Sequence, residues 1–89
     1  MDITFSTKFK RDYKLVAKRG WDISLLRVII TQLANSEPLD PKHKDHRLQG
    51  KFTDCRECHI KPDWLLIYKI NVQANALELV ATGTHSDLF

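Results

Sequence analysis

The sequence lacks the features that mark a membrane or exported protein. Its longest apolar run is Trp64–Tyr68, which is far too short to cross a lipid bilayer. The amino end, Met1–Phe5, has neither the basic lead nor the apolar core of a secretory signal peptide. Internal repeats and low-complexity segments are also absent. We therefore expect a cytoplasmic protein without a membrane partner.

Sulfur-containing residues are scarce: the chain has two cysteines, and Met1 is its one methionine. Cys55, Cys58 and His59 match the C-x-x-C-H spacing of c-type haem attachment. Residues three apart in a strand point to opposite faces, so these two thiols cannot both reach one porphyrin edge. The same geometry opposes a zinc site that adds His46. We interpret both cysteines as reduced structural residues, and expect no cofactor and no bound metal.

The charge is modest and uneven. The formal net charge is +3, with a sequence pI of about 9.0. Between Lys8 and Arg19 six basic side chains face the single acid Asp12. This local positive field suits contact with RNA phosphates or with an acidic protein segment. The alternative is an ordinary solvated helix face.

The hydrophobic pattern predicts one α+β domain over residues 1–89, because a chain this short supports a single core. Phe9, Tyr13 and Val16 recur at helical spacing, and Gly20 can end that helix. A second helix, capped by Asp22, completes a helical hairpin. We predict that the hairpin packs on a largely antiparallel sheet. The sheet is predicted to contain a strand at Ile3–Phe5 and a three-strand meander at Phe52–Ile60, Trp64–Ile70 and Leu77–Ala81. A loop is predicted at Pro38–Gly50.

Three histidines and one aspartate are predicted to meet at one end of this sheet. His46 precedes the meander, His59 and Asp63 flank its first turn, and His85 follows its last strand. Alternating strand directions bring that turn and the terminal segment to the same rim. Imidazoles transfer protons in both directions near neutral pH, as cleavage of RNA through its own 2′-hydroxyl requires. The alternative is a set of scattered surface histidines.

The aromatic residues have two expected roles. Trp64 and Tyr68 are expected to pack in the core. Phe89 ends a polar tail, so it either folds back on the sheet or presents its ring to a ligand.

Three motif blocks, Lys44–Gly50, Arg56–Tyr68 and Gly83–Phe89, resemble the YafQ branch of the RelE/ParE toxin superfamily. The resemblance covers essentially the whole chain. It implies a RelE-like fold and the toxin of a bacterial type II toxin–antitoxin pair. Such a toxin is an endoribonuclease (an mRNA interferase) that cuts mRNA in the ribosomal A site and is silenced by a cognate antitoxin.

The resemblance also implies site residues. His46, His59, His85 and Asp63 would share general-base, general-acid and charge-stabilising work, and Phe89 would hold a base. The order of base and acid stays open, because neighbouring imidazoles titrate as a coupled set.

One position departs from the family pattern. Several relatives have an arginine two positions before the motif glycine, where this chain has Ala81. In this chain another cation binds the phosphate in place of that arginine, or no cation does. The candidate substrate-binding cations are Lys44, Arg47, Lys51 and Arg56. The alternatives to a nuclease are a ParE-like topoisomerase poison without catalysis, and a haem or zinc protein built on the cysteines.

Overall fold

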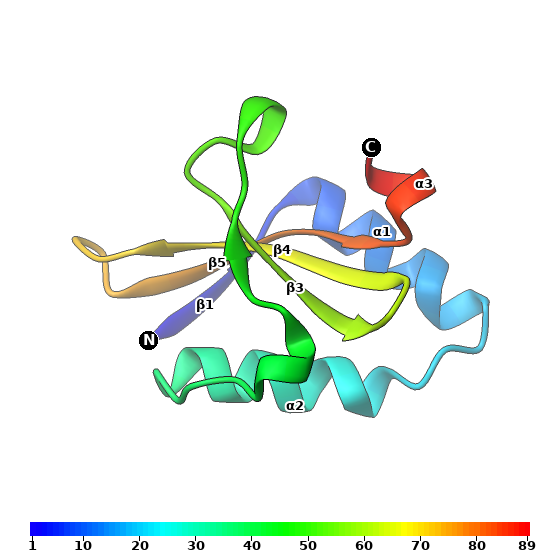
Figure 1. The fold of residues 1–89 in the computed structure, drawn as a ribbon, viewed down its shortest axis with the longest axis horizontal. Helices are drawn as coiled ribbons and strands as arrows, with labels where there is room; N and C mark the ends of the chain where they lie inside the picture. The colour runs from blue at the N-terminus through cyan, green and yellow to red at the C-terminus, as the bar shows by residue number, and fades with distance from the viewer.

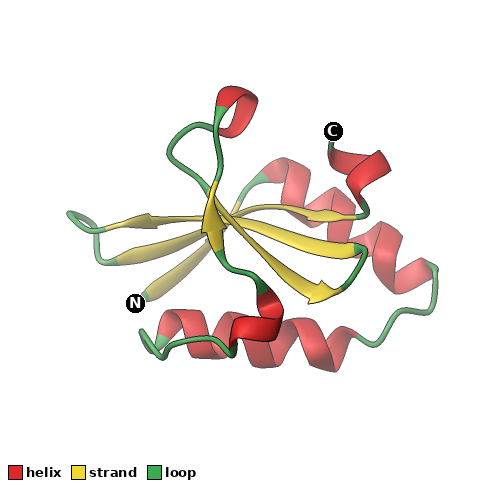
Figure 2. Ribbon diagram, viewed as in Figure 1, coloured by secondary structure: helices red, strands yellow, loops and turns green.

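The chain forms one five-stranded sheet in the order β1-β5-β4-β3-β2, with β1 parallel to β5 and the other pairs antiparallel. The computed structural model describes residues 1–89 (Figures 1 and 2). The strands are β1 (Asp2–Phe5), β2 (His46–Arg47), β3 (Arg56–Lys61), β4 (Trp64–Asn71) and β5 (Ala76–Gly83). The helices are α1 (Thr7–Lys18), α2 (Ile23–Ala34) and α3 (His85–Leu88), with 3-10 turns η1 (Pro41–His43) and η2 (Gly50–Phe52).

The predicted helical hairpin is confirmed, and its ends are capped by side chains. Ser6 Oγ accepts a hydrogen bond from the Phe9 amide at 2.9 Å, and Asp22 Oδ1 accepts one from the Ser24 amide at 3.0 Å. Each cap satisfies an amide that the first helical turn leaves free. Gly20, between the helices, has φ +81°, which glycine adopts without strain.

Two hydrophobic clusters lie on opposite faces of the sheet. The larger contains 13 buried residues and includes the inner faces of α1 and α2. The smaller contains six, and no long helix covers it. Figure 1 shows α2 along one side of the sheet and α3 on the other. The six residues are Phe52, Cys55, Leu65, Ile67, Ala81 and Leu88. This second face is covered only by short segments, and it carries the candidate site.

A register shift in the β4–β5 pair changes which residues of β5 face each cluster. Tyr68 pairs with Leu79, whereas its neighbour Ile67 pairs with Ala81. One extra residue on β5 therefore turns Ala81 to the second face. Thr82 then lies on the helix side, where its hydroxyl accepts a hydrogen bond from Trp64 Nε1 at 2.9 Å.

The structure differs from the sequence prediction between the helices and the meander. The predicted strand from Phe52 begins instead at Arg56, because Gly50–Phe52 form a 3-10 turn and Asp54 has φ +75°. The predicted loop at Pro38–Gly50 contains η1 and β2, so the sheet gains a fifth strand. The α+β class and the meander are confirmed. None of the helices has the length and hydrophobicity that a membrane span needs.

The two cysteines lie in different clusters. Cys58 packs with the helices and Cys55 with the second face, and both are buried free thiols. Burial raises the pKa of Cys58 to about 12 and also raises the pKa of Cys55. The two sulfur atoms therefore have no common approach to a haem or a zinc ion.

Candidate active site

Strand alternation places the first part of the site on the second face of the sheet. His59 pairs with Leu65 and Glu57 with Ile67, and both partners belong to the second cluster. His46 on β2 lies directly opposite Glu57 in the register. The rings of His46 and His59 are 6.4 Å apart between centroids. Two histidines and a carboxyl group thus share one face.

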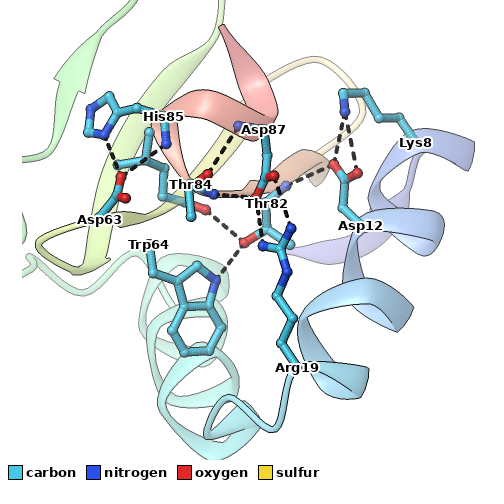
Figure 3. A network of polar contacts seen from close by, with 10 residues as sticks. Lys8, Asp12, Arg19, Asp63, Trp64, Thr82, Thr84, His85 and Asp87 are labelled. Atoms are coloured by element: carbon cyan, nitrogen blue, oxygen red, sulfur yellow. Dashed lines mark hydrogen bonds and ion pairs between the residues drawn. The ribbon is translucent and has the colours of Figure 1, made fainter.

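The short helix α3 brings His85 and Phe89 to the same place. Figure 3 shows His85 on this helix beside Asp63. The His85 ring centroid is 5.8 Å from that of His59 and 6.4 Å from that of Phe89. Phe89 meets Phe52 edge to face at 5.6 Å, yet it remains 62% exposed. Leu88 is buried in the second cluster and anchors the helix. The structure therefore brings His46, His59 and His85 together and places Phe89 at the edge of this group.

Hydrogen bonds fix the orientation of two imidazoles. His59 Nδ1 lies 3.3 Å from the Pro62 carbonyl oxygen, and His85 Nδ1 lies 2.9 Å from Asp63 Oδ1. Because both partners accept, each Nδ1 carries the proton and Nε2 is left to exchange one. The backbone amide of His85, followed by its ring, lowers the pKa of Asp63 below its usual value.

His46 is held differently, between two acceptors. Its Nδ1 lies 2.6 Å from the Lys44 carbonyl oxygen, and its Nε2 lies 3.0 Å from Glu57 Oε2. The two contacts together hold the imidazole ring in one orientation. Glu57 is only 4% exposed, and its Oε1 has no hydrogen-bond partner. A carboxylate this deeply buried is uncommon, and here it pairs with the half-exposed ring of His46.

The proposed phosphate-binding cations are not all near the histidines. Arg56 faces the helix side, where its Nε and Nη2 donate to Asp45 Oδ1 at 2.7 and 2.6 Å. Asp45 also accepts a hydrogen bond from Tyr68. Arg47 pairs with Arg56 and shares its face, away from His46. The sequence interpretation of these two arginines as substrate ligands is thus not supported by their placement.

Lys51 is the candidate cation that contacts the aromatic edge of the site. Its Nζ lies 5.4 Å from the centroid of Phe52, the ring that touches Phe89. Lys44 contributes its carbonyl oxygen to His46 and is exposed. Ala81 lies fully buried on the site face and carries no charge there.

One group of side chains could hold a metal ion. Glu57, His59 and His85 each offer one ligand atom, and these atoms lie within 4.8 Å of one another. One carboxylate and two imidazoles suit a transition metal. The cysteines take no part in this group.

Comparisons with known proteins identify the family and related structures. A family model described as "Bacterial toxin of type II toxin-antitoxin system, YafQ" matches residues 1–89. The chain is 42% identical over 89 residues to the mRNA interferase toxin YafQ of Escherichia coli K12, covering 99% of this chain and 95% of that protein. A metal-bound toxin from Helicobacter pylori is 49% identical, with a TM-score of 0.94 and coverage of 100% and 99% of the two chains. The E. coli DinJ–YafQ complex contains a chain that is 42% identical, with a TM-score of 0.89 and coverage of 99% and 97%.

Proposed function

The chain belongs to the YafQ family of bacterial type II toxins, and from this premise we propose that it is an mRNA interferase that cuts mRNA in the ribosomal A site. Residues 1–89 act as one toxin domain in the cytoplasm. The reaction is attack of a 2′-hydroxyl oxygen on the adjacent phosphorus. The bond from phosphorus to the 5′-oxygen breaks, which leaves a 2′,3′-cyclic phosphate and a 5′-hydroxyl.

The cluster of imidazoles on one open face is the observation that carries this proposal. The attacking hydroxyl must lose a proton, and the leaving oxygen must gain one. His59 and His85, 5.8 Å apart between ring centroids, each have Nε2 available for these transfers. No step requires a metal ion.

His46 is instead assigned to binding of the phosphate, and Glu57 orients His46. His46 has an acceptor at each ring nitrogen, which fixes its ring on the site face. Lys51 supplies a cation on the Phe89 side. Glu57 is a positioning residue for His46, and nothing in the sequence pattern had singled it out.

Mapping of cut sites tests the proposal. Purified protein is added to a translation extract that contains ribosomes, and the 5′ ends of the mRNA fragments are mapped by primer extension. We expect cuts only on ribosome-bound mRNA, and their loss in His59→Ala and His85→Ala. The matched control is Ser86→Ala, because Ser86 is an exposed neighbour on α3. Wild-type cutting by both histidine variants would refute the assignment.

The topoisomerase-poison alternative receives no support from the family match. A poison of that kind needs no converging imidazoles. A DNA supercoiling assay separates the two functions, and we expect no inhibition by the wild-type protein.

A groove away from the histidines fits the second partner, a cognate antitoxin. It has a volume of about 670 Å³ and lies between α1, α2 and the open edge strand β1. Phe5, Phe9 and Ile30 are among its apolar lining, and Lys10 and Lys14 stand on its wall. We propose that an acidic, amphipathic antitoxin segment occupies it. A complex of this kind is known for the E. coli relative by the name DinJ–YafQ.

Charge reversal tests this docking surface. The variant Lys10→Glu/Lys14→Glu should slow association with the antitoxin and weaken its dependence on salt. Lys69→Glu is the control, because Lys69 is exposed on β4 and does not line the groove. Equal association rates for all three proteins would exclude the groove.

A second candidate property is inhibition by a transition metal. Glu57, His59 and His85 fit such an ion, and one similar protein is described as metal-bound. An ion there would occupy the imidazole lone pairs that proton transfer needs. We expect micromolar zinc to inhibit cutting and a chelator to restore it. Undiminished cutting in saturating zinc would exclude inhibition at this site.

A further inference from the structure

The helix α3 is too short to hold its own position. It contains only four residues, and it carries His85 at one end with Phe89 directly after the other. Isolated helices of this length do not persist in water. Its placement therefore depends on the side chains that fasten it to the rest of the fold.

Asp87 is the most connected of these side chains (Figure 3). Its Oδ2 accepts a hydrogen bond from the Thr84 amide at 2.8 Å, and the Asp87 amide donates to Thr84 Oγ1 at 3.0 Å. Arg19 adds a two-pronged contact, with Nη1 donating to Oδ2 at 2.7 Å and Nη2 donating to Oδ1 at 3.0 Å. The carboxylate thus caps its own helix and holds α3 to the end of α1.

The backbone leaves room for this carboxylate. Gly83 has φ +154°, and a Cβ atom there would lie 2.8 Å from Asp87 Oδ2. Any side chain at this position would displace the carboxylate or strain the backbone. The absence of a side chain at Gly83 and the presence of Arg19 therefore both serve the placement of Asp87.

Arg19 itself rests on a fixed support. Its guanidinium carbon lies 5.2 Å from the centroid of the Trp21 ring, and Trp21 packs on Trp64 at 5.1 Å. Trp64 is buried and donates its indole N–H to Thr82. The guanidinium thus connects α3 to the core through the rings of Trp21 and Trp64, which meet at an angle of 56°.

We propose that Arg19 and Asp87 are positioning residues of the active site, which hold α3 so that His85 meets Asp63 and Phe89 meets Phe52. The assignment rests on the proposed nuclease function. A partly exposed ion pair adds little to the free energy of unfolding. Two-point contact by a planar guanidinium does restrict orientation, which a single ammonium contact does not. Loss of the pair should therefore affect the chemical step far more than stability.

Steady-state cutting of ribosome-bound mRNA tests the pair. Arg19→Met removes the charge but keeps the length, and Asp87→Asn keeps an acceptor for Thr84. We expect each variant to lower kcat about 10- to 100-fold, the scale of misplaced catalytic groups, with little change in KM. The double variant should lose no more than either single one. Arg19→Lys should recover only part of the loss.

Lys18→Met is the matched control, because it removes one positive charge from the adjacent turn of α1. Its kcat should equal that of wild type. An equal loss in Lys18→Met and Arg19→Met, or a change in KM alone, would show that the charge binds RNA. Wild-type kcat in Arg19→Met would overturn the proposal.

Proton NMR separates this inference from the proposed function. We expect wild-type protein to show contacts between the rings of Phe52 and Phe89, and a hydrogen-bonded Nδ1–H on His85. Arg19→Met should lose both signals while Lys18→Met keeps them. If wild-type protein fails to cut mRNA but shows this pattern, the nuclease function is wrong and the positioning role of the Arg19–Asp87 pair stands. Retention of both signals in Arg19→Met would reject that positioning role.

Discussion

Replacement of Glu57 by leucine should stabilise the fold and abolish cutting. Glu57 is 4% exposed, and its Oε1 has no donor. A buried polar atom without a partner costs about 1–3 kcal/mol. Leucine removes that atom and occupies a similar volume. The substitution also removes the contact to His46, but that ring is half exposed, so water replaces the lost partner.

The expected gain follows from these two terms. Loss of a half-exposed contact costs about 0–1 kcal/mol, which leaves a net stabilisation of up to about 3 kcal/mol. For a domain of this size each kcal/mol shifts Tm by about 4–8 °C, so Glu57→Leu should melt up to roughly 24 °C above wild type. Loss of the orientation of His46 should reduce kcat by at least about 100-fold.

Thermal melts and cut-site mapping on the same preparations provide the assay. Glu57→Gln separates charge from polarity, because it keeps a polar group at His46 and should therefore gain less stability. Glu78→Leu, a carboxylate on β5 without a histidine contact, is the control and should cut normally. A lower Tm together with wild-type cutting in Glu57→Leu would refute both claims, namely that Glu57 destabilises the fold and that it positions His46.

Three further predictions concern the aromatic edge, the thiols and the metal. Phe89→Ala should reduce cutting about 5–150-fold, equivalent to the 1–3 kcal/mol of one base stack, with an unaltered pH profile. His85→Ala should lose about 10²–10⁴-fold in kcat. Identical kinetics in the two variants would contradict the assignment of Phe89 to base binding and of His85 to proton transfer. Cys55→Ser/Cys58→Ser should be colourless and cut within a few-fold of wild type, and native Cys58, with its pKa raised to about 12, should resist thiol reagents at pH 7; a folded but inactive double variant would revive a role for the cysteines. Cutting should survive excess 1,10-phenanthroline, which leaves ribosomal magnesium in place, and loss of cutting on intact ribosomes would show that a transition metal is required.

The parts of the fold that depend on local pattern could be predicted. The spacing of Phe9 and Val16 and the cap at Asp22 locate the helical hairpin, and alternation locates the meander. Strand β2 contains only His46 and Arg47 and exists through pairing with β3. Likewise α3 forms through capping and tertiary contacts. Segments this short have too little sequence to specify a structure by themselves.

The convergence of histidines was predictable, but the face on which they lie was not. Alternation groups Glu57 with His59, and Arg56 with Cys58. Burial does not say which group faces a ligand, because Glu57 is 4% exposed and Cys58 is fully buried. The choice depends on where the helices pack. For that reason the sequence predicts Arg56 as a substrate ligand and does not single out Glu57.

Three positions around the second face of the sheet depart from ordinary packing. Glu57 buries an unpaired oxygen, Gly83 leaves space that the Asp87 carboxylate approaches, and Phe89 exposes most of its ring. The helix-covered face, by contrast, is filled with apolar side chains. Local exceptions of this kind are expected where function competes with stability. If RNA is the ligand, its bases offer Phe89 a stacking partner that the free protein lacks. Glu57→Leu, the substitution expected to stabilise this face, is therefore also expected to silence the toxin.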